Sequence, residues 1–227
     1  MPMRMEIKIP LPVAKLPEVE AWIRVHPAHW RRAYPPRHVN NVYFETPDFD
    51  GLRANLWGLL DRAKLRMRWY GSDLARFDAA QLELKSKRGT AGWKEMVILD
   101  RSFDLRTQSW DQVRGAVVQA GHATAALWLG QSPVPVLINR YRRSYYETPD
   151  GEVRLTVDTD MRAFGQLART HPNLDDRVSL EPQLVIELKA PADPNLARRL
   201  ASILSQFPVR VDRFSKYVNA LLAMPYV

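Results

Sequence analysis

The segment RAKLRMRWY, residues 62–70, decides the fold because its two faces have opposite character. Side chains two residues apart on a β-strand point to the same side. The apolar face holds Leu65, Met67 and Trp69. The opposite face holds four cations in a row, Arg62, Lys64, Arg66 and Arg68. Like charges at this spacing repel, so we expect a bound anion or neighbouring acids to neutralise this face.

Seven further segments have the periodicity or the composition of strands, and several repeat this division into a charged and an apolar face. In residues 81–87, for example, Glu83, Lys85 and Lys87 lie opposite Leu82 and Leu84. The remaining segments are residues 4–9, 39–46, 92–99, 134–146, 152–159 and 183–189.

Helices are predicted outside these strands. Residues 17–25, 48–57 and 213–223 carry apolar side chains at helical spacing. Ser109 and Gln112 form a capping-box pattern for a helix that Gly121 would end. Asp193 and Pro194 begin another, whose apolar residues extend to Phe207.

Together these elements predict an α+β fold in a single domain, residues 1–227. We expect an eight-stranded antiparallel β-barrel, a tunnel with a charged interior, decorated by helices on the outside. The helices have apolar stripes that need an apolar surface, and an inverted barrel supplies one. A barrel with its charged faces in solvent explains the strand alternation but not the helices, and it remains the alternative.

The composition of the chain limits which kinds of binding partner and metal site it can have. The chain has 227 residues, a formal net charge of +8 and no cysteine, so it forms no disulfides or thiolate metal sites. No apolar run is long enough for a membrane segment, and no secretory signal is present, so we expect a cytoplasmic protein. The basic residues lie on strand faces rather than on an outer helix or loop, so we expect no nucleic-acid partner.

Seven motifs, in order, resemble the VTC domain of polyphosphate polymerases, a branch of the triphosphate tunnel metalloenzymes. They are EIK at 6–8, VYFETPD at 42–48, KLRMRWYG at 64–71, LELKSK at 82–87, VRLTVD at 153–158, IELK at 186–189 and FSKY at 214–217. The resemblance covers nearly the whole chain. It implies a basic tunnel that binds ATP, triphosphate or polyphosphate with a divalent metal, Mn²⁺ or Mg²⁺.

Matched motif by motif, the resemblance also implies individual roles. The catalytic phosphate ligands would be Arg66, Arg68, Lys85, Arg154 and Lys216. Further substrate-binding residues would be Lys8, Lys64, Arg140 and Lys189. The metal would lie on Glu187, with Glu6 as a second ligand.

Three functions fit these residues. The first is polyphosphate synthesis by transfer of the ATP γ-phosphate to a polyphosphate chain. The second is hydrolysis of inorganic or nucleoside triphosphate, and the third is non-catalytic binding of polyphosphate or inositol polyphosphate. Hydrolytic relatives begin with a Glu-x-Glu-x-Lys motif, whereas this chain has Arg4 in place of the first glutamate. That replacement favours the first function over the second.

Overall fold

The computed structural model describes residues 4–89, 91–120, 122–205 and 214–225. Its strands are β1 (Arg4–Pro12), β2 (Arg31–Glu45), β3 (Asp61–Tyr70), β4 (Arg76–Phe77), β5 (Ala80–Arg88), β6 (Ala91–Leu99), β7 (Phe103–Asp104), β8 (Val134–Glu147), β9 (Arg154–Gly165) and β10 (Gln183–Pro191). Its α-helices are α1 (Leu16–Val25), α2 (Asp50–Leu56), α3 (Trp110–Gln119), α4 (Ala123–Gln131), α5 (Pro194–Ser205) and α6 (Lys216–Leu222).

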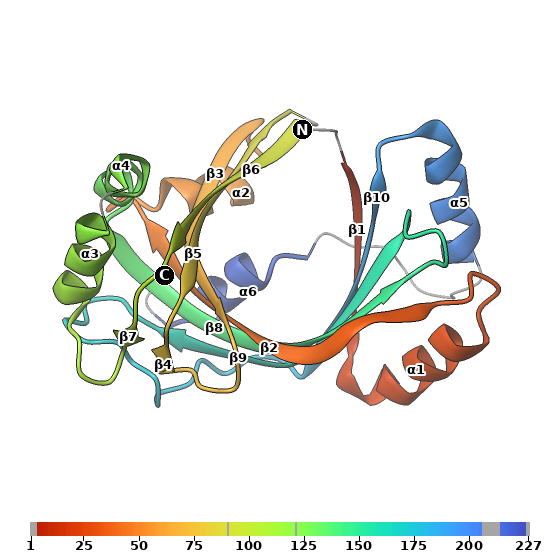
Figure 1. The fold of residues 1–227 in the computed structure, drawn as a ribbon, viewed down its shortest axis with the longest axis horizontal. Helices are drawn as coiled ribbons and strands as arrows, with labels where there is room; N and C mark the ends of the chain where they lie inside the picture. Colours follow the sequence, from red (N-terminus) through yellow and green to blue (C-terminus); the bar gives the residue numbers. More distant parts are fainter. Residues whose placement is uncertain (1–3, 90, 121, 206–213, 226–227) are drawn as a thin grey trace. The chain divides into compact units, whose positions relative to one another are not determined.

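In the described ranges, eight strands form one antiparallel sheet in the order β1-β10-β9-β8-β2-β3-β5-β6 (Figure 1). The short strands β4 and β7 pair separately. The α+β fold class and all eight predicted strands are confirmed. None of the described helices is long and apolar enough to cross a membrane.

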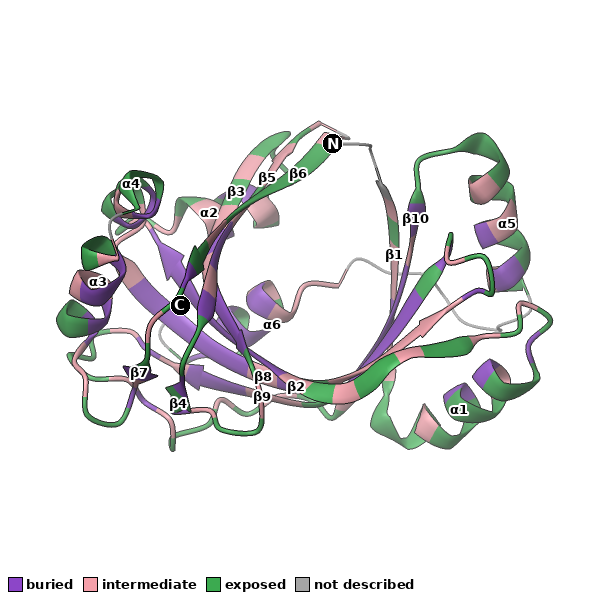
Figure 2. Cartoon of the chain, in the orientation of Figure 1, coloured by how far each residue is buried: buried purple, intermediate pink, exposed green. Residues whose placement is uncertain are grey.

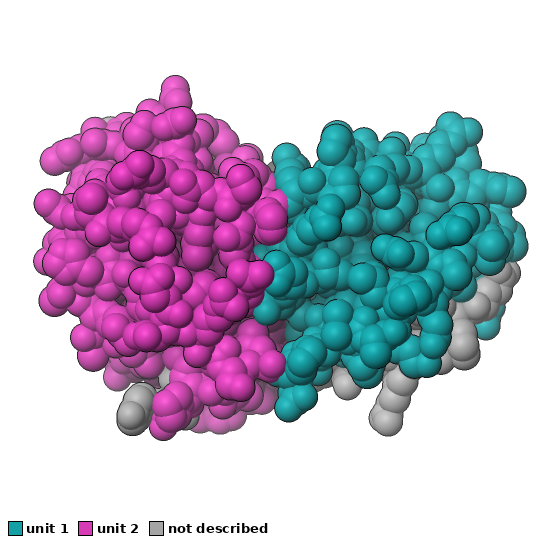
Figure 3. All heavy atoms as spheres, turned by 90° about the horizontal axis from the view of Figure 1, so that it is seen from below, with its two compact units in different colours: residues 1–37, 141–161, 181–214 teal, residues 38–140, 162–180, 215–227 magenta. Residues whose placement is uncertain are grey.

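The chain forms two compact units (Figure 3). Unit 1 comprises residues 1–37, 141–161 and 181–214, and unit 2 comprises residues 38–140, 162–180 and 215–227. The boundaries between the units fall inside strands β2, β8 and β9. That the chain is a single domain stays a prediction.

In unit 2, the apolar face of β3 is buried beneath helices. Leu65, Met67 and Trp69 are at most 2% exposed and pack in one cluster with residues of α3 and α4. The capping box at Ser109 is formed, since its side chain accepts the Gln112 N–H and the Gln112 side chain accepts the Ser109 N–H. The helices therefore cover the face that the alternation predicted.

Unit 1 is built in the same way. Leu155, Ile186 and Leu188 are fully buried in a cluster with residues of α1 and α5. Figure 2 shows both helices buried along one side and exposed along the other. The charged residues of β9 and β10 thus lie on the face away from these helices.

Some elements differ from their predicted extents. Strand β2 begins at Arg31 and runs through Pro35 and Pro36, eight residues before the predicted start at Val39. Helix α4 was not predicted, because His122 at its N-cap makes no side-chain capping bond and its sequence is short. The predicted helix boundaries at Gly121, Phe207 and Arg213 lie outside the described residues, as does the side chain of Arg4.

Candidate functional site

On strands β3, β5 and β6 of unit 2, the charged face carries a group of basic side chains that we call the cation field. The strand register places Lys64, Lys85 and Lys94 directly beside one another on the three strands. The flanking rows add further basic residues on the same side. In the described part of these strands the face holds seven cations, Arg62, Lys64, Arg66, Arg68, Lys85, Lys87 and Lys94.

Glu83 is the carboxylate embedded in this field, with a side chain that is 1% exposed. Its Oε2 lies 2.7 Å from Arg66 Nε and 3.9 Å from Arg68 Nη1, and its Oε1 lies 2.9 Å from Lys94 Nζ. Burial by itself raises the pKa of Glu83, but the charges of Arg66, Arg68 and Lys94 outweigh it and lower the pKa to about 2. The residue is therefore an anion at neutral pH.

A line of amides orients Arg68. Arg68 Nε donates to Asn41 Oδ1 at 2.8 Å, and Asn41 Nδ2 donates to Asn139 Oδ1 at 2.8 Å. Both asparagines are buried, so each needs these bonds to satisfy its polar atoms. The network fixes the guanidinium on the charged face.

Helix α6 packs on this same face, in addition to the helices on the apolar one. The Tyr217 ring lies 4.8 Å from the Tyr43 ring, and its hydroxyl donates to the buried carboxylate of Glu45. Lys64 Nζ lies 4.8 Å from the centre of the Tyr217 ring and donates to Ser215 Oγ at 3.2 Å. Burial raises the pKa of Glu45, with the Tyr217 and Gly51 hydrogen bonds opposing it.

Unit 1 contains a second cluster, centred on Glu187. Arg143 makes a bidentate pair with Asp158, with Nε–Oδ1 and Nη2–Oδ2 distances of 2.6 and 2.7 Å. The same Nη2 lies 3.2 Å from Glu187 Oε2, and Lys189 Nζ lies 3.0 Å from Glu187 Oε1. Burial opposes the charge of Glu187, but Lys189, Arg143 and Lys8 hold its pKa well below the ordinary value.

Strand β1 brings two more predicted residues to this cluster. In the antiparallel register Lys8 lies opposite Glu187 and Glu6 lies opposite Lys189, while Lys8 Nζ is 2.9 Å from Glu6 Oε1. Arg154, opposite Lys189 on β9, is exposed. The cluster therefore joins Lys8, Arg154, Lys189, Glu6 and Glu187 as one charged surface.

Glu187 and Glu6 are the residues that the resemblance implies as ligands of a divalent metal. No group of three or more histidines, aspartates and glutamates in the described ranges is arranged to hold a metal ion. Mg²⁺ and Mn²⁺ nevertheless take hard oxygen ligands, and Mg²⁺ often uses only one or two carboxylates together with water and substrate phosphates. In this structure the two oxygens of Glu187 are paired with Lys189 and Arg143, and Glu6 is paired with Lys8. That Glu187 and Glu6 hold the metal therefore stays a prediction.

Two predicted residues lie apart from these clusters. Arg140 was expected on the charged face, but Asn139 occupies that face of β8, so the neighbouring Arg140 points to the opposite one. There it donates to the Ser72 carbonyl at 3.0 Å. Lys216 is the half-buried first residue of α6.

Sequence reasoning missed Arg143, Asp158, Lys94 and Asn41 as site residues. Arg143 lies two residues after Tyr141 and four after Asn139 on β8, so the alternation of that strand already predicted its side chain on the same face as theirs. The amide of Asn41 carried no comparable signal, because its partners Arg68 and Asn139 come from distant segments.

The sequence profile of the VTC domain matches residues 3–225. Two solved structures are similar in fold. A candidate adenylate cyclase from Vibrio parahaemolyticus is 13% identical, with a TM-score of 0.51 over 94% of this chain and 95% of that one. A candidate adenylyl cyclase from Hippeastrum, with a dominant triphosphatase activity, is 14% identical, with a TM-score of 0.52 over 96% and 93%. No curated protein matches significantly.

Proposed function

The chain belongs to the VTC domain family, and from that premise we propose a metal-dependent phosphotransferase that acts on ATP or triphosphate. The reaction that fits best is transfer of the ATP γ-phosphoryl group to a polyphosphate chain. The observation that supports it is the field of cations on β3, β5 and β6, which surrounds the buried Glu83. Such an excess of positive charge favours a polyanionic ligand.

Arginines and lysines have different tasks on this face. Arg66 and Arg68 carry planar guanidinium groups of the kind that binds phosphate oxygens, and their contacts with Glu83 and Asn41 hold these groups in place before substrate binds. The Nε and Nη2 atoms of Arg66 are engaged by Glu83, so its Nη1 would be the atom offered to phosphate. Lys85 is exposed, and Lys94 is 43% exposed while it pairs with Glu83, so both would act on a bound phosphate as point charges. Preorganised charge of this kind stabilises the charge on the transferred group without reorganisation.

The transfer step needs little from acid–base groups. An ionised terminal oxygen of the polyphosphate forms a bond to the γ-phosphorus, and the bond from that phosphorus to the β–γ bridging oxygen breaks, which releases ADP. The acceptor carries no proton to remove, so no general base is required. A metal held by Glu187 and Glu6 would supply charge neutralisation at phosphate oxygens.

Hydrolysis of triphosphate is the second candidate, and the triphosphatase activity of the Hippeastrum protein favours it. The two reactions share the donor and differ only in the acceptor, water or phosphate. Binding without turnover is the third. The products formed from ATP therefore distinguish the three.

The test is incubation of the purified chain with ATP and Mn²⁺ or Mg²⁺, with products resolved by gel and by phosphate assay. Long-chain polyphosphate supports synthesis, free phosphate alone supports hydrolysis, and unchanged ATP with tight triphosphate binding supports a sensor. Arg66→Gln should reduce turnover at least about tenfold, since charge-assisted contacts contribute about 1.5–3 kcal/mol. Arg88→Gln is the matched control, because Arg88 is exposed and pairs with Asp61.

A further inference from the structure

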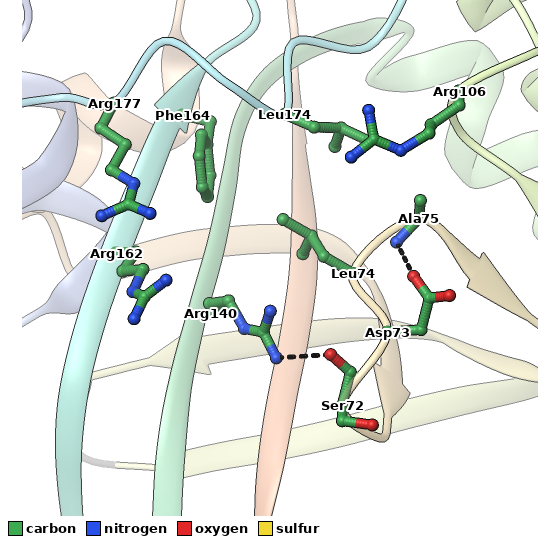
Figure 4. Close-up of a pocket in the computed structure, with 10 residues that line it drawn as sticks. All are labelled: Ser72, Asp73, Leu74, Ala75, Arg106, Arg140, Arg162, Phe164, Leu174 and Arg177. Atoms are coloured by element: carbon green, nitrogen blue, oxygen red, sulfur yellow. Dashed lines mark hydrogen bonds between the residues drawn. The ribbon is translucent and has the colours of Figure 1, made fainter.

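Unit 2 has an open pocket of about 470 Å³ that is lined by four arginines and four apolar side chains, together with Ser72 and Asp73 (Figure 4). Of the described residues, Arg106, Arg140, Arg162 and Arg177 line it. The resemblance to the VTC domain implied a substrate-binding role for Arg140 alone among these four, and the proposed reaction uses none of them.

The pocket lies on the face of the sheet away from the seven-cation field. Arg140 shares its face of β8 with Ile138, which packs in the apolar cluster beneath α3 and α4. Arg162 shares its face of β9 with Phe164, which belongs to the same cluster and also lines the pocket. Asn139, which points the other way, bonds Asn41 on the charged face. The sheet therefore separates the two groups of cations.

Four different segments position the arginines. Arg140 and Arg162 are half-buried on neighbouring strands, and Arg177 is held by an antiparallel bridge to Phe164. Arg106 follows β7, and the pairing of β7 with β4 fixes that loop. Four guanidinium groups from separate segments give the pocket an excess of positive charge, which attracts anions.

The wall opposite the strand arginines is ordered by its own hydrogen bonds. Arg140 Nη2 donates to the Ser72 carbonyl at 3.0 Å. Asp73 Oδ1 accepts the backbone N–H groups of Ala75 and Arg76 at 2.8 and 3.1 Å. Among the described lining residues, Asp73 supplies the carboxylate. One of its oxygens, Oδ1, accepts the hydrogen bonds from the loop backbone. The pocket therefore keeps a net positive lining.

We propose that this pocket is a second phosphate-binding site, for a compact anion with several phosphate groups. Guanidinium forks bind phosphate oxygens in pairs, and four of them around one space match an anion with many such oxygens. The inference stands independently of the proposed phosphotransfer, because it uses residues on the other face of the sheet.

The experiment is calorimetric titration of the full chain with inorganic tripolyphosphate at constant ionic strength. The wild-type chain should show two classes of site. The double variant Arg106→Gln/Arg177→Gln changes two exposed side chains and should weaken one class at least about tenfold while the other is kept. Arg162→Gln should weaken the same class, and Arg88→Gln should weaken neither. Parallel titrations with ATP and with orthophosphate test the class of ligand, and an affinity for orthophosphate equal to that for tripolyphosphate would contradict a site for an anion with several phosphate groups.

Two outcomes overturn the inference. In one, the pocket variants titrate like Arg88→Gln; in the other, the wild-type chain has a single class of site that Arg66→Gln removes. If instead the pocket variants lose a site and Arg66→Gln changes neither binding nor turnover, the second site stands and the proposed function fails. Melting temperatures of all variants confirm that each one is folded.

Discussion

Glu187 has two possible roles in its cluster, and one substitution separates them. As a metal ligand it is needed for turnover, whereas as a counter-ion to Arg143 and Lys189 it is needed for folding. We expect Glu187→Gln to lower metal-dependent ATP consumption by orders of magnitude while triphosphate still binds. The measurement combines turnover, triphosphate affinity and the melting temperature of the free protein.

Glu152→Gln is the control for this variant, because Glu152 is an exposed carboxylate in the same unit. Full activity per folded molecule in a destabilised Glu187→Gln protein would remove Glu187 from the metal site.

Glu83 should make stability depend on pH in the acid range. Its pKa falls from the ordinary 4.5 to about 2 in the folded chain, so its contribution is fully present above pH 4.5 and is lost as pH falls through 2. The difference corresponds to about 3 kcal/mol of unfolding free energy. Denaturant unfolding of wild type and Glu83→Gln at several pH values measures it.

Glu83→Gln should be less stable than wild type near pH 7, and the difference should shrink toward pH 2. The exposed Glu18→Gln serves as the control. An equal loss of stability at pH 7 and pH 2 would show that packing, rather than charge, accounts for the role of Glu83.

At the scale of elements, α6 is held by a buried hydrogen bond from Tyr217 to Glu45, in addition to the apolar contacts of Ala220 and Leu221. Tyr217→Phe removes the hydroxyl that donates to Glu45 and keeps the ring that contacts Tyr43 and Lys64. Loss of a partner for a buried polar group costs about 1–3 kcal/mol, so the melting temperature should fall. Burial already raises the pKa of Glu45, and loss of this bond should raise it further.

Thermal unfolding at several pH values tests the role of this bond. The loss in Tyr217→Phe should be smaller at low pH, where Glu45 is neutral in both proteins. A variant as stable as wild type at every pH would show that α6 does not need the bond.

For the whole molecule, the net charge of +8 predicts strong salt dependence of triphosphate binding. Raising the ionic strength from about 10 to 150 mM shortens the Debye length from about 30 to 8 Å. We expect affinity for triphosphate to fall about tenfold or more across this range. Calorimetry at fixed pH measures it, and an affinity independent of salt would contradict binding through cations.

The melting temperature of the free protein should respond less to the same salt, because the Arg143–Asp158 and Arg66–Glu83 pairs are largely buried. Screening acts mainly on exposed charges. A parallel loss of affinity and of stability would indicate general destabilisation instead.

Alternation and local capping were readable from the sequence. A period of two fixed the faces of β3, β5 and β10, since each side chain follows directly from its neighbours. The capping box at Ser109 is equally local and was correctly predicted. The order of the motifs indicated the VTC family, which the match over residues 3–225 confirms. These features depend on residues that lie close together along the chain.

Only the tertiary structure decided which charges meet. The pairing of Arg143 with Asp158 and Glu187 joins residues from three strands, and strand register, not local sequence, sets that pairing. Arg140 shows the same limit, because its place on the face opposite Asn139 became evident only from the contacts of both residues. Sequence determined which residues are charged and how they alternate within a strand. The long-range packing of strands determined their partners, because electrostatic energy depends on distance in space.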